Sequence, residues 1–151
     1  MKSKFYLLLF SVLASLSVFT FTACDDDEKI EEEIIETAKV KYSCQATSDL
    51  AELVDMVIVY VDKDGKEVSE KLEGLTWNKE IVVKKPFKAN VQIKCNKKGD
   101  FTPNKEYYEI GLEVIVHERM YRNIARVHQS EIVKFIDNFC KFKHGETSEV
   151  E

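Results

Sequence analysis

The chain has 151 residues, of which 22 are lysine or arginine and 27 are aspartate or glutamate, so its formal net charge at pH 7 is −5. This length accommodates one domain with a genuine hydrophobic core. The acidic balance argues against a nucleic-acid-binding protein, because such proteins depend on lysine and arginine to displace counterions from phosphates. We therefore expect no nucleic acid among its partners.

The first 23 residues combine a basic start with a long apolar run. Lys2 and Lys4 precede the uncharged segment 5–21, and two small residues follow it. A positive start, an apolar run and a small-residue end are typical of an export signal. Residues 1–23 are therefore predicted to be a signal peptide. Without them the number of basic residues falls from 22 to 20, and the net charge becomes −7.

A cysteine stands where the apolar run ends. The sequence Phe21-Thr22-Ala23-Cys24 resembles the lipobox of bacterial lipoproteins, in which cleavage precedes a lipidated cysteine. Phe21 holds the position at which this family usually has leucine or another aliphatic residue. The resemblance implies a diacylglyceryl group on the Cys24 thiol. Two or more acyl chains on one cysteine make a durable membrane anchor.

Two other interpretations of this segment stay open. Cleavage after the small-residue sequence Ser15-Leu16-Ser17 would release a soluble protein. An uncleaved segment 5–21 would span the membrane, with Lys2 and Lys4 inside the cytoplasm. All three interpretations place residues 25–151 outside the cytoplasm.

Acidic residues follow the cysteine without interruption. Asp25, Asp26, Asp27 and Glu28 resemble the export signal that Bacteroidetes-type lipoproteins carry after the lipidated cysteine. This resemblance implies a place on the outer face of the outer membrane. The alternative is a lipoprotein that faces the periplasm, with the acids acting only as a solvated spacer. Segment 24–37 is too highly charged to bury a core, so we expect it to be an extended acidic tether. A short helix with Ile30, Ile34 and Ile35 on one side is the alternative.

Residues 38–145 carry the pattern of a β-rich domain. Alternating apolar and polar side chains predict half-buried strands at 39–46, 87–95 and 108–117. An uninterrupted apolar run predicts a central strand at 56–61. Asp64-Gly65 predicts a type I′ hairpin turn into a polar edge strand at 66–72. Further strands are expected before Pro86 and, more weakly, at 121–128.

Two segments carry helical signals. Ser48-Asp49 is expected to cap a helical turn that runs through Leu53. Ser130 is expected to cap a helix with apolar residues at helical spacing, namely Ile132, Phe135, Ile136 and Phe139. His144-Gly145 is expected to end this helix, and residues 146–151 are expected to form a disordered tail.

Six or seven short strands separated by frequent turns predict a mainly β protein. The expected fold is an antiparallel immunoglobulin-like or transthyretin-like β-sandwich of about seven strands with a short C-terminal helix. Such sandwiches are often tethered to bacterial surfaces. This resemblance of fold assigns no function.

Three cysteines remain after Cys24. Cys44 and Cys95 each share an alternating face with apolar residues, so both are expected to face the core. An extracytoplasmic compartment permits a disulfide, and Cys44–Cys95 is then the pair expected to form it. Buried free thiols are the alternative. The chain contains no Cys-x-x-Cys sequence, so neither a redox motif nor a zinc knuckle is predicted.

No motif predicts a metal, a cofactor or a catalytic residue. The sequence Asp62-Lys63-Asp64-Gly65 begins like a calcium loop, but Lys66 interrupts the acidic positions. His117-Glu118 has a tyrosine, Tyr121, where a zinc-protease helix would have its second histidine. Cys140 and His144 could share a helix face, but the spacing of Cys140 from Ile136 favours packing over catalysis.

Three aromatic residues near strand ends are the candidate ligand contacts: Trp77, Phe101 and Tyr107. Such side chains stack on sugar rings or peptide side chains, although Trp77 equally suits a sandwich core. We expect a non-enzymatic lipoprotein that presents a small β-sandwich binding module for a protein or glycan at the bacterial surface. The alternatives are an assembly subunit that donates an edge strand and a small envelope hydrolase.

Overall fold

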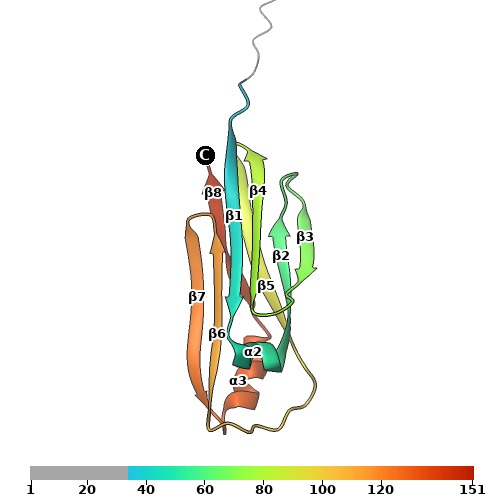
Figure 1. The fold of residues 1–151 in the computed structure, drawn as a ribbon, viewed down its shortest axis with the longest axis vertical. Helices are drawn as coiled ribbons and strands as arrows, with labels where there is room; N and C mark the ends of the chain where they lie inside the picture. The colour runs from blue at the N-terminus through green and yellow to red at the C-terminus, as the bar shows by residue number, and fades with distance from the viewer. Residues whose placement is uncertain (1–33) are drawn as a thin grey trace, which may run out of the picture. The chain divides into compact units, whose positions relative to one another are not determined.

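Two four-stranded antiparallel sheets make up the computed structural model, which describes residues 34–151 (Figure 1). One sheet has the order β4 (Thr76–Lys84), β1 (Thr37–Ala46), β6 (Tyr107–Val116) and β7 (Arg119–His128). The other has the order β3 (Glu67–Lys71), β2 (Val54–Val61), β5 (Phe87–Lys97) and β8 (Lys143–Val150). The predicted mainly β sandwich is confirmed, with eight strands in residues 34–151 in place of about seven.

The N-terminal predictions lie outside the described residues. These are the signal peptide 1–23, the lipidation site Cys24 and the acidic residues Asp25, Asp26, Asp27 and Glu28. Residues 34–36 lead in extended, exposed form into β1, which begins at Thr37. The sequence placed the start of the domain at residue 38, one residue after the start of β1.

The alternation of buried and exposed side chains explains why the strands predicted from the sequence form. In β1, Val40, Tyr42 and Cys44 are buried between the sheets, while Lys39 and Lys41 point to solvent. Strands β5 and β6 follow the same rule. Strand β2 lies between β3 and β5, as expected for a strand that is apolar on both faces.

The β2–β3 hairpin turn differs from its prediction. A type I′ turn requires positive φ at both Asp64 and Gly65. Gly65 has a φ of +77°, but Asp64 does not adopt a positive φ. Instead, Asp62 Oδ1 accepts hydrogen bonds from the backbone N–H groups of Asp64 and Lys66, both at 2.9 Å. This side chain stabilises a longer turn, and β3 is an edge strand as predicted.

The short helices α2 (Ser48–Leu53) and α3 (Ile132–Phe139) begin differently from their predictions. Thr47, and not Ser48, caps α2, because its Oγ1 accepts the N–H of Leu50 at 3.4 Å. Ser130 does not cap α3, since its Oγ bonds His128 Nδ1 at 2.9 Å. Neither of these helices, the only ones in residues 34–151, is long and apolar enough to cross a membrane.

The predicted disordered tail is wrong. Residues 143–150 form β8, which pairs with β5 from Lys94↔Lys143 to Phe87↔Val150. The helix that was expected to reach His144-Gly145 already ends at Phe139. His144, Ser148 and Val150 are buried, and most of these inward positions are polar. The strand therefore lacks the alternating hydrophobicity by which strands are recognised in a sequence.

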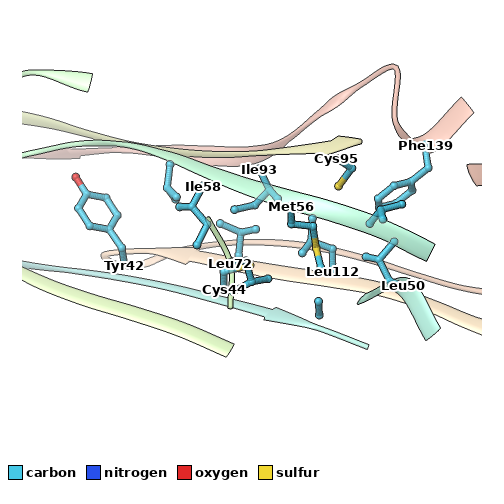
Figure 2. Packing of buried hydrophobic residues seen from close by; sticks show 14 of the residues in the cluster. Tyr42, Cys44, Leu50, Met56, Ile58, Leu72, Ile93, Cys95, Leu112 and Phe139 are labelled. Carbon is cyan, nitrogen blue, oxygen red and sulfur yellow. The ribbon is translucent and has the colours of Figure 1, made fainter. Parts of the chain in front are cut away.

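Of the two alternatives for Cys44 and Cys95, the structure has buried free thiols and not the disulfide. Both side chains face the core as expected, but Cys44 belongs to β1 and Cys95 to β5, in opposite sheets (Figure 2). Packed sheets lie about 10 Å apart, whereas a disulfide needs Cα atoms within about 7 Å. Burial raises the pKa of each thiol to about 12. Both cysteines are therefore buried free thiols in this structure.

Deleting residues 146–151 tests the role of β8. We expect the deletion to lower the free energy of unfolding by about 2–5 kcal/mol, because it removes strand hydrogen bonds and the buried Val150 side chain. Urea denaturation measures the change. Deleting only Glu151, which is exposed, is the matched control and should leave the stability unchanged. Equal stability of the two deletions would contradict the assignment of β8.

Candidate functional site

The three predicted ligand contacts do not converge. Trp77 in β4 lies opposite Cys44, which in turn lies opposite Val114 in β6. Tyr107 is seven residues further along β6, roughly 23 Å at 3.3 Å per residue. Phe101 belongs to the segment 98–106 and packs against the core. A single site built from these three aromatic side chains is therefore absent from the described part of the chain.

Trp77 belongs to a polar cluster between the two sheets. Glu70 of β3 accepts hydrogen bonds from Trp77 Nε1 (2.8 Å), the Tyr60 hydroxyl (2.7 Å) and Lys79 Nζ (3.0 Å). We call these four residues the Glu70 cluster. Tyr60 and Glu70 come from one sheet, and Trp77 and Lys79 from the other. The cluster therefore joins the two sheets at their β3 and β4 edges.

The Glu70 carboxylate is held in its ionised form. Hydrogen bonds from Trp77, Tyr60 and Lys79 lower its pKa to about 2. An ionised carboxylate with three donors is poorly suited to act as a general acid. Trp77 is correspondingly half-buried and packs on Tyr60, with ring centroids 5.3 Å apart. The cluster is a structural link, and Trp77 is a packing residue of the sandwich.

Tyr107 lies on the outer face of the neighbouring strands β6 and β7. Its side chain is 42% exposed, and the Arg126 guanidinium lies 4.2 Å from the ring centroid. Arg122 Nε contacts Glu113 Oε2 at 3.4 Å. All three arginines of the chain lie in β7. We call this surface the β6–β7 face, and it consists of Tyr107, Glu109, Glu113, Met120, Arg122, Ile124, Arg126 and His128.

The chemistry of the β6–β7 face suits an extended acidic ligand. Arginine binds carboxylates through a planar fork of N–H donors, and each guanidinium has more donors than its present contact uses. Met120 and Ile124 are 57% and 54% exposed and lie on the same face as Arg122. The sequence analysis missed this surface, although three arginines within eight residues were a visible signal.

Two hollows open elsewhere on the domain. A groove of about 340 Å³ lies beside α2 and the β3–β4 connection, lined by Asp55, Lys71, Leu75 and Lys98 among others. Asp55 is the ion-pair partner of both lysines, at 3.7 and 3.9 Å. A polar hollow of about 200 Å³ overlies β5 and β8 at Asn90, Gln92, Gly145 and Thr147. Neither hollow is lined by a cysteine, serine or histidine.

The Cys140–His144 pair does not form a nucleophile and base. His144 Nε2 bonds the Phe139 carbonyl oxygen, and Nδ1 bonds the Tyr121 hydroxyl, each at 2.9 Å. Because a carbonyl only accepts, Nε2 carries the proton and Nδ1 accepts from Tyr121. Both ring nitrogens are thus engaged without Cys140. Within residues 34–151, no cluster of three or more histidine, cysteine or acidic side chains could hold a metal ion.

Comparison with known proteins leaves the chain without a family assignment. No protein-family model matches it, and none of the curated proteins shows a significant match. The sandwich fold alone assigns no function, because similar sandwiches serve unrelated functions.

Replacing Glu70 tests the link between the sheets. Glu70→Gln removes the ion pair with Lys79 and one of two equivalent acceptor oxygens, so we expect a loss of about 1–3 kcal/mol in the free energy of unfolding. Glu67→Gln, an exposed neutralisation in the same strand, is the matched control and should have little effect. A loss of the same size in both variants would contradict a specific role for Glu70.

The same variant has a defined pH dependence. The pKa of Glu70 falls from 4.5 to about 2 on folding, so its ionised form stabilises the native state fully above pH 4.5. This contribution is lost as the pH falls from 4.5 towards 2. The stability difference between wild type and Glu70→Gln should therefore shrink over that range. Urea denaturation at several pH values measures it, and a constant difference would contradict the lowered pKa.

Proposed function

We propose that this protein is a bacterial envelope lipoprotein that is held by lipid on Cys24 and presents its β-sandwich at the cell surface as a non-enzymatic binding module. One observation carries the proposal. The N-terminal segment has its features in the order that a surface lipoprotein requires: a basic start, an apolar run, the sequence Phe21-Thr22-Ala23-Cys24 and the acids Asp25–Glu28. Two or more acyl chains would make this attachment durable.

The arrangement of the sandwich supports this proposal. The compact unit begins at Ile34, so residues 25–33 separate it from Cys24. The chain enters the domain at the start of β1, while α2 and α3 lie at the opposite end (Figure 1). A domain tethered through β1 would turn that opposite end away from the membrane. Phe142, in the connection from α3 to β8, is an exposed aromatic side chain that suits contact with a protein or glycan.

A second candidate function, an assembly subunit that joins its neighbours through an edge strand, is favoured by one feature. Strand β7 ends its sheet and carries three arginines and two exposed apolar side chains. Sheet edges of this kind bind extended segments by strand addition. Both candidate functions use the same lipid-anchored placement and differ in the partner.

Substitution of Cys24 tests the lipid anchor. Cys24→Ala should abolish incorporation of radiolabelled palmitate and release the protein from the membrane fraction, because the anchoring thiol is lost. Cys140→Ala removes a thiol that has no place in the lipobox, so this control should keep the label and the membrane association. If Cys24→Ala remained labelled and membrane-bound, the proposed anchor would be wrong.

Neutralising the acids after Cys24 tests surface exposure. In a Bacteroidetes host, protease added to intact cells should degrade the wild-type domain. The variant with Asp25, Asp26 and Asp27 changed to Asn and Glu28 changed to Gln should stay in the membrane fraction but become protected. The control neutralises four later acids, Glu31, Glu32, Glu33 and Glu36, and should remain accessible. Equal accessibility of all three proteins would show that these acids do not direct export.

A further inference from the structure

Three of the four edge strands carry a charged residue at an inward-facing position inside the strand, whereas the fourth, β7, carries one at its first residue. Glu70 in β3, Lys79 in β4 and Glu146 in β8 each lie opposite a buried residue of the neighbouring strand. An inward-pointing charge on an edge strand discourages a further strand from pairing with it. Edges β3, β4 and β8 are thus protected against strand addition.

In strand β7 the inward charge is that of Arg119, which lies at the first residue of the strand opposite the buried Val116 and leaves the rest of the strand without this protection. Its inward positions from residue 121 to residue 127 hold the uncharged side chains Tyr121, Asn123, Ala125 and Val127. Within residues 34–151, β6 is its only strand neighbour. Because β7 is an edge strand, every second residue turns its backbone N–H and C=O groups away from the sheet. This ten-residue edge remains open to another strand.

The side chains of β7 determine which charge a strand added to this edge must carry. If β7 paired with itself in antiparallel fashion about Ile124, Arg122 of one copy would lie opposite Arg126 of the other. Like charges in directly opposite positions destabilise a strand pair. Acidic side chains at those positions would instead form ion pairs, and apolar ones would cover Met120 and Ile124, which are more than half exposed.

We propose that the β7 edge binds the acidic segment 25–36 of a second copy of this chain as an additional strand. That segment contains eight acids, one lysine and three isoleucines. Ile34 and Ile35 at its end are 88% and 52% exposed in the single chain. In extended form the segment reaches roughly 40 Å, which covers the roughly 33 Å of β7. Its charge, its apolar side chains and its length therefore match the edge.

The course of the chain favours a second copy over the same copy. The Lys85 N–H donates to the Glu36 carbonyl oxygen at 2.9 Å, so the chain at Glu36 still runs beside the end of β4. Strand β4 is the edge opposite β7, with β1 and β6 between them. To reach its own β7, the segment would have to reverse direction and cross both strands. The β7 edge of a neighbouring molecule requires no such reversal.

This inference goes beyond the proposed function, which leaves the partner open, and it does not require the lipid on Cys24. Its test uses the chain without residues 1–23 and with Cys24→Ala, studied by analytical ultracentrifugation. At low ionic strength the protein should form a dimer or larger assembly. In 1 M NaCl, where the screening length is about 3 Å, the association constant should fall by about tenfold or more.

Charge reversal identifies the surfaces involved. Arg122→Glu with Arg126→Glu should weaken association by about tenfold or more, because both arginines would then repel the acidic segment. Lys39→Glu with Lys41→Glu reverses two charges on the outer face of β1 in the same sheet and should leave association unchanged. Circular dichroism checks that every variant is folded. Glu31→Lys, Glu32→Lys and Glu33→Lys in a second protein should restore association when it is mixed with the arginine variant.

Three results would overturn the inference. The first is a protein that stays monomeric at low ionic strength over the whole concentration range. The second is an assembly that survives the arginine reversal as well as it survives the lysine reversal. The third is a monomer whose β7 amides are protected from hydrogen exchange only when residues 25–33 are present, since this would place the segment on its own β7. None of these results bears on lipid attachment, which palmitate labelling tests separately.

Discussion

Burial of alternate side chains between two sheets is the constraint on which the rest of this structure depends. Tyr42 and Ile58, from opposite sheets, are almost completely buried in the same core (Figure 2). A one-residue slip of β1, the strand of Tyr42, would turn its apolar face to solvent and its lysines inward. Register in the sandwich is therefore strongly specified. The same alternation decides which side chains remain outside and available to partners.

The two open sides between the sheets are closed by polar contacts. On one side the Glu70 cluster joins β3 and β2 to β4 through an ionised carboxylate. On the other side the Tyr121 hydroxyl of β7 bonds His144 of β8. Within residues 34–151 no buried side-chain nitrogen or oxygen atom lacks a hydrogen-bond partner, so these contacts stabilise the seams without requiring further apolar residues. This closure also withdraws Trp77 and His144 from any role at the surface.

The proposed cellular location of the protein and its binding partner depend on different parts of the molecule. The proposed location depends on a short stretch of covalent and charge chemistry around Cys24, which any folded domain could follow. The partner depends on the surface of the sandwich, where Arg122 and Arg126 of β7 are the arginines of the β6–β7 face in an otherwise acidic chain. If the acidic segment 25–36 also binds that face, one segment would serve both export and association. This would account for an acidic tether that ends in exposed isoleucines.

The sequence by itself determined the sandwich class, strands β1, β2, β5 and β6 and the inward orientation of Cys44 and Cys95, because a period of two in hydrophobicity is local information. Only the tertiary structure decided that residues 143–150 form β8. Its inward positions include His144 and Ser148, whose burial depends on residues far away in the chain. The tertiary structure also decided that Cys44 and Cys95 form no disulfide and that Trp77 and Tyr107 lie far apart. Distances between strands follow from contacts across the whole fold, which no short window of sequence contains.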